Sequence, residues 1–328
     1  MSRLSKTLLP LVALAGLTVG LASGRPVHGA EAFEFVALGD MPYELPDDTI
    51  RFDRLIAAIN EIKPAFSIHV GDTKAGSTPC SDEAIRRVKD QFMTFAGPLI
   101  YTPGDNEWTD CHRKKAGEYD PSERLAFVRK LHFAEAKSLG GKPMPLTRQS
   151  DAGKYKDMVE NARWVQGSIL FATVHVVGSN NGFGRDAAAD KEYRGRNEAN
   201  IAWIGETFAI AKRENRDAVV FAFQADPEFE AKHGADSGFG DTIKAFVKGA
   251  MAFAKTVLLI QGDDHEFYVD QPLTTDLEDG ETLENVYRLQ VMGKREIQAV
   301  RVGVHPGDPV VFSFRPLIVK ENINPIEE

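Results

Sequence analysis

The sequence predicts a layered α/β fold in which two mixed sheets pack between helices, an α/β/β/α sandwich. Short runs rich in β-branched and aromatic residues alternate with amphipathic stretches of helical length from Phe33 to Asp263, which is the pattern of βαβ units. From Asn285 to Lys320 the sequence alternates like antiparallel strands separated by Gly and Pro turns. Parallel strands followed by a β-rich end favour two packed sheets.

Each expected element follows from a local pattern. The apolar runs predict strands over 33–40, 66–72, 98–105, 218–223 and 256–263, and two adjacent strands over 162–178 that turn at Gly167. Apolar residues at helical spacing predict helices over about 49–63, 81–95, 121–137, 187–214 and 241–254. We therefore expect three helices to connect the early strands and two to connect the later ones.

The first 30 residues are typical of a signal peptide. Arg3 and Lys6 precede an apolar run, and small residues offer cleavage after Gly24 or after Ala30. The run contains Pro10 and is shorter than the roughly 20 apolar residues that span a bilayer, so we expect no stable membrane anchor. The predicted location is periplasmic or secreted.

Removal of residues 1–30 leaves 31–328 as one predicted domain, because no linker, repeat or low-complexity tract divides it. The formal net charge of −9 becomes −12 in this part of the chain, since the removed segment carries Arg3, Lys6 and Arg25 and no acid. Such a charge disfavours nucleic acid and anionic lipid as partners. The oligomeric state is left open.

The chain has two cysteines, Cys80 and Cys111. Export would place them in an oxidising compartment, so we expect a disulfide between the loops that follow the second and third predicted strands. Two buried free thiols are the alternative. A zinc site on these cysteines is not expected, because no second pair of ligands stands at zinc-finger spacing.

Four predicted strands end in the same dipeptide. These are Gly39-Asp40, Gly71-Asp72, Gly104-Asp105 and Gly262-Asp263. A single Asp at a strand end is usually a turn former or a helix cap. Four together favour one common crevice, because ligands of open α/β sheets gather beyond the carboxyl ends of the strands. Bunched carboxylates repel one another, and a divalent cation is their natural counter-charge.

The order and spacing of these segments resemble the calcineurin-like metallophosphoesterases. That family carries Asp-x-His, Gly-Asp, Gly-Asn-His-Asp/Glu, a later strand histidine and Gly-His-x-His. The matching segments here are GDMPY at 39–43, GDTKAG at 71–76, GDNE at 104–107, FQADP at 223–227 and GDDHEF at 262–267. The resemblance covers nearly all of the chain after residue 30. It implies metal-dependent hydrolysis of small phosphorylated substrates.

The resemblance also implies a set of metal ligands. One metal would be held by Asp40, Asp72 and His265, and Asp72 would bridge to a second metal held by Asp105, Gln224 and Asp263. Several family histidines are replaced: Pro42 stands in the first motif, Asn106 at the catalytic position, and Gln224 and Asp263 at ligand positions. An oxygen-rich set of this kind favours Mg²⁺, Mn²⁺ or Ca²⁺ over Zn²⁺.

Two functions follow from this pattern. The first is an exported metal-dependent phosphoester hydrolase, and the alternative is a catalytically inactive relative that binds a metal or a phosphorylated ligand. The catalytic candidates are Asp72, Asn106 and His112, of which His112 would replace the missing acid. The alternative for His112 is an exposed loop histidine without function. No Gly-x-Ser-x-Gly elbow or Walker A run occurs, so those two chemistries are excluded.

Other polar residues near the motifs allow two interpretations. Lys74 and the basic run 113–115 either attract an anion or form a solvated surface. Residues 180–181 either reach the crevice or form a turn. His69 and His175 are expected to pack within strands, since His69 lies at odd spacing from Asp72 and so faces the other side of the sheet.

Overall fold

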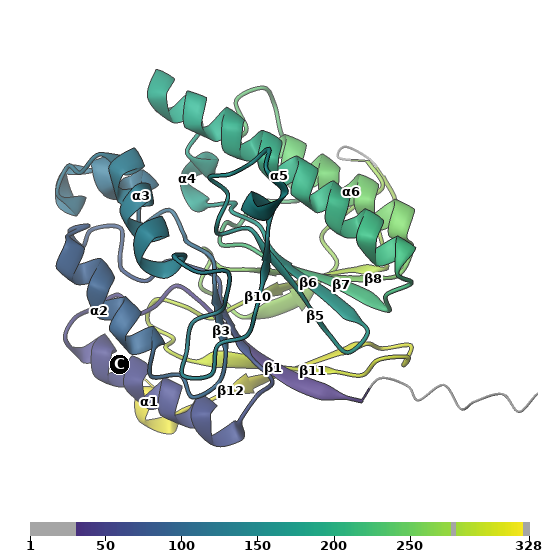
Figure 1. Cartoon of the computed structure of the whole chain (residues 1–328), viewed down its shortest axis with the longest axis horizontal. Coiled ribbons are helices and arrows are strands. Elements are labelled where there is room, and N and C mark those ends of the chain that lie inside the picture. The colour runs from purple at the N-terminus through teal and green to yellow at the C-terminus, as the bar shows by residue number, and fades with distance from the viewer. Residues whose placement is uncertain (1–30, 277–279, 324–328) are drawn as a thin grey trace, which may run out of the picture.

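The computed structural model describes residues 31–276 and 280–323, in which two sheets face each other (Figure 1). The first sheet has the strand order β12-β11-β1-β2-β3. β1, β2 and β3 are parallel to one another, and β11 and β12 run antiparallel to their neighbours. The bounds are Phe33–Leu38 (β1), Ser67–His69 (β2), Leu99–Tyr101 (β3), Ala299–Val304 (β11) and Phe312–Leu317 (β12). The predicted signal peptide lies outside the described residues.

The second sheet has the order β4-β5-β6-β7-β8-β10-β9. Its central strands, β6, β7, β8 and β10, are parallel to one another. The edge strands β4, β5 and β9 pair antiparallel with their neighbours. The bounds are Thr147–Arg148 (β4), Ala162–Gln166 (β5), Ile169–Thr173 (β6), Ala218–Ala222 (β7), Thr256–Gln261 (β8), Tyr268–Asp270 (β9) and Val286–Gln290 (β10). The predicted pair of strands turning near Gly167 is therefore confirmed as β5 and β6.

Helices cover the outer face of each sheet, which gives the predicted α/β/β/α layers (Figure 1). The first sheet carries α1 (Asp47–Ile62), α2 (Asp82–Phe92) and α3 (Pro121–His132). The second carries α5 (Ala187–Arg213) and α6 (Gly240–Phe253). Shorter elements are η1 (Thr109–His112), η2 (Lys114–Ala116), η3 (Gln149–Ala152), α4 (Gly178–Asn181) and η4 (Lys320–Asn322). Among the described helices, none has the length and apolar composition needed to cross a bilayer.

Three helices begin at a capping side chain. Ser81 accepts a hydrogen bond from the Ala84 amide, and Asp120 accepts one from the Glu123 amide. Asp186 accepts from two amides in the first turn of α5. Each cap satisfies amide groups that the first helical turn leaves without partners, so local sequence sets where these helices start.

Aromatic residues from both sheets form the layer between them. Phe66 lies 5.2 Å from Phe35 in its own sheet and 5.1 Å from Phe171 in the other, measured between ring centroids. Trp164 stacks on Phe171 at 5.2 Å. Burial of each such side chain contributes about 1.5–3 kcal/mol. This packing holds the sheets face to face, so the loops beyond their strand ends can share one site.

Two expectations about local structure were wrong in detail. The tail is not uniformly antiparallel, because β10 lies in the second sheet and pairs parallel with β8. The third helix ends at His132 rather than near residue 137, because the chain then turns back to the first sheet. There Leu139 exchanges two backbone hydrogen bonds with Leu99, which replace those of a further helical turn.

Candidate metal centre

The aspartates of the four Gly-Asp pairs lie together beyond the strand ends. One carboxylate oxygen from each of Asp72, Asp105 and Asp263 lies within 4.8 Å of the others. Asp40 joins this group through the backbone, since the Asp263 amide lies 3.1 Å from both of its carboxylate oxygens. The arrangement follows the strand-end pattern of the sequence.

The glycines of these pairs allow the close approach. A Cβ atom at Gly104 would lie 2.0 Å from Oδ1 of Asp72, and one at Gly262 would lie 2.3 Å from Oδ2 of Asp40. Any other residue at either position would therefore push a carboxylate out of the cluster.

The backbone is also bent at the site. Asp40, Asp72, Asp263 and His265 have φ values of 53°, 56°, 78° and 71°, in the left-handed region that residues other than glycine seldom occupy. Such conformations cost free energy and persist only where the surrounding structure holds them. Here they turn four polar side chains toward one centre.

Asp72 is the most heavily hydrogen-bonded member of the cluster. Its Oδ2 accepts from the Tyr43 hydroxyl at 3.0 Å, and its Oδ1 accepts from the Asn106 amide at 3.1 Å. The Asn106 side chain donates a further bond to Oδ2. Asn106, at the position of the family's catalytic histidine, is thus directed at Asp72 and has no group that can act as an acid.

Asp105 and Gln224 meet the short α4 turn. The Ser179 hydroxyl donates to Oδ2 of Asp105 at 2.6 Å, and the amide of Gly178 donates to Oε1 of Gln224 at 2.6 Å. Oδ1 of Asp105 is buried and has no hydrogen-bond partner among the described residues. An unpartnered buried carboxylate oxygen is costly unless a cation meets it.

His265 completes the group from the loop after β8. Its Nε2 lies 3.4 Å from the Tyr43 hydroxyl oxygen and 3.9 Å from Oδ1 of Asp40. The side chain is 27% exposed, whereas Asp40 is fully buried. His265 therefore lies where the cluster opens to solvent.

Burial and mutual repulsion perturb these carboxylates. Burial raises the pKa of Asp40 well above the usual value, and the carboxylate of Asp263 raises it further. Burial likewise raises the pKa of Asp72, and the carboxylate of Asp105 adds to that effect. Burial and then Asp105 raise the pKa of Asp263 to about 7. The raised pKa that like charges predict for at least one aspartate is thus present.

Three residues near the cluster have contacts or burial that the sequence motifs did not predict. Glu107 is buried and accepts bonds from the amides of Thr73 and Gly104, so it fixes both loops. Ser179 contacts Asp105 directly, although only its neighbours 180 and 181 were considered. Asp110 is buried, and burial followed by the charge of Asp105 raises its pKa to about 7. The sequence holds no motif that would have singled out Ser179 or Asp110.

Lys74 lies closer to the site than a solvated surface would place it, whereas residues 113–115 of the basic run are exposed. Lys74 is 2% exposed, and its burial lowers its pKa while Glu107 and Asp72 oppose that effect. The solvated interpretation of Lys74 is therefore wrong. Arg113 forms a 2.5 Å ion pair with Asp110.

His112 lies on the η1 turn and is exposed. Its Nδ1 is 2.7 Å from the carbonyl oxygen of Thr109 and 3.4 Å from Nη1 of Arg185. These contacts orient it away from a direct hydrogen bond to the carboxylate cluster. Its role as an acid stays a prediction.

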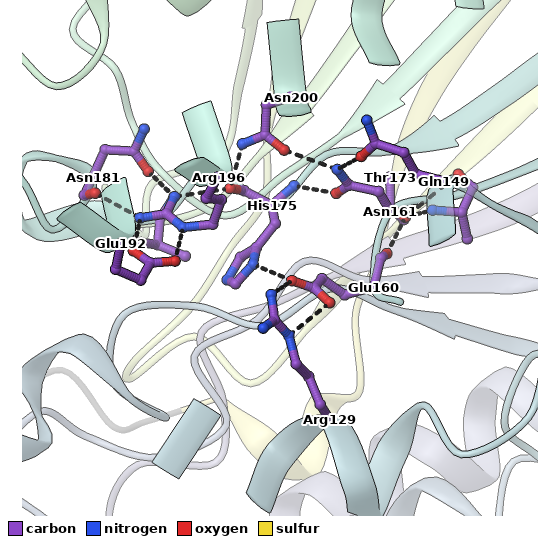
Figure 2. A network of polar contacts seen from close by, with 12 residues as sticks. Arg129, Gln149, Glu160, Asn161, Thr173, His175, Asn181, Glu192, Arg196 and Asn200 are labelled. Carbon is purple, nitrogen blue, oxygen red and sulfur yellow. Dashed lines mark hydrogen bonds and ion pairs between the residues drawn. The ribbon is translucent and has the colours of Figure 1, made fainter. Parts of the chain in front are cut away.

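The two strand histidines pack as expected. His69 is buried against Phe52 and Phe92 and accepts from the Gly71 amide. His175 belongs to a separate buried network, in which its Nδ1 lies 2.6 Å from a carboxylate oxygen of Glu160 (Figure 2). Asn181 serves that network by accepting a bond from Arg196, so it does not reach the metal cluster.

The predicted disulfide joins Cys80 to Cys111, with Cα atoms 5.7 Å apart. It links the loop before α2 to the η1 turn that follows Asp105. The bond therefore ties together two loops that border the site, and the alternative of two free thiols is wrong.

No protein-family model matches the sequence, and no curated protein matches it. Solved structures do match. A dimetal phosphatase from Danio rerio is 9% identical with a TM-score of 0.53, and the alignment covers 86% of this chain and 98% of that one. GAP50, the anchor in the inner membrane complex of Plasmodium, is 12% identical with a TM-score of 0.50, with coverage of 89% and 91%.

A purple acid phosphatase from yellow lupin (Lupinus luteus) seeds is 12% identical with a TM-score of 0.53. The alignment covers 87% of this chain and 52% of the lupin chain, so this chain spans about half the length of that enzyme. At such identities the likeness concerns the fold. The chain has the fold of the calcineurin-like metallophosphoesterases.

Proposed function

We propose that this chain is an exported, metal-dependent hydrolase of small phosphate esters. The observation that carries the proposal is the buried group of Asp72, Asp105 and Asp263, whose oxygens lie within 4.8 Å of one another. Three carboxylates this close repel one another strongly unless a cation or shared protons neutralise them. Two of the similar structures are phosphatases.

The residues present fit a divalent metal. Oδ1 of Asp105 is a buried oxygen without a partner in the described part of the chain, which suits a ligand atom. The donors of the cluster are carboxylate oxygens, joined at the solvent side by His265. Such a set favours Mg²⁺, Mn²⁺ or Ca²⁺ over Zn²⁺. Asp72, Asp105 and Asp263 would hold the ion, with Asp40 and His265 beside them and Gln224 contributing if its amide turns.

When bound, a divalent ion would stabilise charge on a phosphoryl oxygen and activate water for attack on phosphorus. The chain's own residues would arrange the rest. Tyr43 and Asn106 hold the Asp72 carboxylate in place by hydrogen bonds from both sides. Lys74 lies buried nearby and offsets part of the negative charge. His112 is the candidate proton donor to the leaving group.

The inactive alternative keeps one specific observation in its favour. Asn106 replaces the family's acid, and its amide is engaged with Asp72. GAP50, an anchor protein by description, has a similar fold. A chain of this fold that binds a metal or a phosphorylated ligand without turnover would satisfy the same geometry.

Metal content and turnover separate these functions. The purified protein should retain a stoichiometric divalent ion by elemental mass spectrometry, and it should hydrolyse p-nitrophenyl phosphate with activity lost on chelation and restored by Mg²⁺ or Mn²⁺. Bound ion without turnover would favour the inactive alternative. Neither ion nor turnover would reject both.

Export is tested independently. Expression of the full chain should yield a processed protein in the periplasm or the medium, with an N-terminus that begins after Gly24 or after Ala30. The disulfide supports this location, because such bonds persist in oxidising compartments. An unprocessed protein confined to the cytoplasm would contradict it.

A further inference from the structure

Arg113 borders the metal centre through one intervening hydroxyl group. Its Nη2 donates to the Ser179 hydroxyl oxygen at 3.0 Å, and that hydroxyl donates to Oδ2 of Asp105 at 2.6 Å. Its Nη1 forms the 2.5 Å ion pair with Asp110. The guanidinium is thus linked to a carboxylate of the cluster and held by a second, buried carboxylate.

The same guanidinium also lies near the other side of the centre. A Cβ atom at Gly76 would be 2.7 Å from Oδ1 of Asn106 and 3.4 Å from Nη1 of Arg113, so both side chains face this one residue. Asn106 in turn donates to Asp72. Arg113 is therefore linked to Asp105 through Ser179 and lies near Asn106, the residue that donates to Asp72.

Arg113 is accessible, whereas the acid that holds it is not. Its side chain is 49% exposed, and that of Asp110 is 3% exposed. A guanidinium has five N–H donors, of which Asp110 and Ser179 engage two among the described contacts. The remaining N–H groups can donate hydrogen bonds to an anion, and the planar, forked guanidinium matches the oxygens of a phosphoryl group.

The turn that carries Arg113 is fixed from several sides. The disulfide at Cys111 ties it to the Cys80 loop, and Arg185 donates to the Thr109 carbonyl at 2.9 Å. The Asp110 amide donates to the Asp105 carbonyl at 3.1 Å. A donor held this way loses little freedom when a ligand binds, which favours affinity.

We propose that Arg113 binds the anionic phosphoryl group of the substrate, with Ser179 and Asp110 as the positioning residues that orient its guanidinium. The negative cluster alone would repel such a group, whereas the exposed guanidinium of Arg113 can bind one of its oxygens. A divalent ion held by the aspartates would stabilise charge on the same group. This inference rests on the proposed function for the identity of the ligand. It extends that function by assigning a residue to substrate binding.

The test uses inorganic phosphate as the probe on Mn²⁺-loaded full-length protein. By titration calorimetry, Arg113→Met should weaken phosphate binding by about 10- to 100-fold, the usual effect of losing hydrogen bonds from a charged group. Arg113→Lys should fall between, because it restores charge without the fork. Mn²⁺ affinity should stay within about 2-fold, since Arg113 contacts the ligands only through Ser179.

Two further variants show whether the effect is local. Arg213 forms an exposed ion pair with Glu214 at the C-terminal end of α5, which precedes β7 and lies opposite the site. Arg213→Met removes the same charge there and should leave phosphate binding unchanged. Lys114→Met should weaken it only slightly. Equal losses in Lys114→Met and Arg113→Met would overturn the proposal, because they would indicate a diffuse field.

The remaining outcomes are also decisive. Phosphate binding in Arg113→Met and Arg113→Lys as tight as in the native protein would overturn the proposal, as would native protein that binds Mn²⁺ but no phosphate. If phosphate binding depends on Arg113 but no ester is turned over, the assignment of Arg113 stands and the hydrolase function fails. Where turnover is present, Arg113→Met should raise KM for p-nitrophenyl phosphate more than it lowers kcat.

Discussion

Two buried polar clusters contact Trp108: the Glu160 network and the aspartate cluster. The first pairs opposite charges, whereas the second brings like charges together. The amide of Trp108 donates to the carbonyl of Asp105 in the aspartate cluster, and its ring lies 5.4 Å from His175 in the Glu160 network. In the Glu160 network, Glu160 pairs with Arg129 at 2.6 Å (Figure 2). The aspartate cluster instead brings carboxylates close to one another.

The difference appears in the pKa values. The Glu160 carboxyl is fully buried, yet the charges of Arg129 and His175 hold its pKa well below the usual range. Asp72 is equally buried, but there burial and then the charges of Asp105 and Glu107 raise its pKa well above the usual value. The buried charge of Glu160 is tolerated because it is paired inside the chain. In the aspartate cluster, the described residues compensate the negative charge only in part, through Lys74. We infer that the Glu160 network serves stability and that the aspartate cluster serves a ligand.

The largest expected effect is on turnover. Asp72→Asn should reduce p-nitrophenyl phosphate hydrolysis to background, because Asp72 belongs to the group of three carboxylates that would hold the ion and no described neighbour can replace its charge. Asp241→Asn, which alters an exposed aspartate at the start of α6, is the control and should retain native rates. Full turnover by Asp72→Asn would reject the metal-dependent mechanism.

The next effect is on stability, and here the two clusters should respond with opposite signs. Glu160→Gln should lower the free energy of unfolding by about 3 kcal/mol, because it leaves a largely buried arginine without its charge partner. Asp72→Asn should raise the stability of the metal-free protein by about 1 kcal/mol, because it removes one of several repelling charges. Urea denaturation after chelation measures both.

An exposed ion pair provides the control for this comparison. Glu198 pairs with Lys154 at 2.9 Å, and both side chains are mostly exposed. Glu198→Gln should therefore leave the free energy of unfolding essentially unchanged. Destabilisation by Asp72→Asn as large as that by Glu160→Gln would show that the aspartate cluster is structural.

The clusters should also differ in pH dependence. The folded-state pKa of Asp263, about 7, lies above its usual 3.8, so its contribution to stability is present in acid and is lost as pH rises toward 7. The pKa of Glu160 is lowered, so its contribution is lost only as pH falls through the acid range. Metal-free protein should therefore lose stability between about pH 4 and 7, from the usual pKa of Asp263 to its raised folded-state pKa.

Mn²⁺ should reverse that loss. Metal binding requires deprotonated carboxylates, so its affinity should rise across the same pH range, and saturation at about 100 times Kd should add about 2.7 kcal/mol. Thermal or urea unfolding with and without Mn²⁺ at several pH values measures this. A metal effect that is equal at pH 5 and 8 would contradict the assignment of these carboxylates as ligands.

The smallest expected effect concerns His112. His112→Ala should cost about 10-fold in kcat, less than the 10²- to 10⁴-fold typical of a general acid, because activated water can assume part of the role. The pH profile of kcat should lose its basic limb in this variant. If kcat and its pH profile are unchanged in this variant, His112 has no catalytic role and is an exposed residue that contacts Thr109 and Arg185.

The layers, the disulfide partners and the convergence of the Gly-Asp pairs could all be predicted from the sequence. These features follow from local rules, since hydrophobic period sets strands and helices, and parallel strands end at one edge of a sheet. Gly104 and Gly262 were informative because only glycine fits where a Cβ would meet Asp72 and Asp40. Spacing alone therefore located most of the candidate site.

The other residues that join that site could be identified only from the folded structure. Ser179 reaches Asp105 because α4 holds it at a φ of 51°, a conformation that no local motif announces. Lys74 is buried, and Arg113 donates to Ser179, because loops far apart in the sequence come together there. β10 joins β8 for the same reason. Burial and charge pairing depend on neighbours that folding brings together, and the periodicity of the sequence does not predict which residues become neighbours.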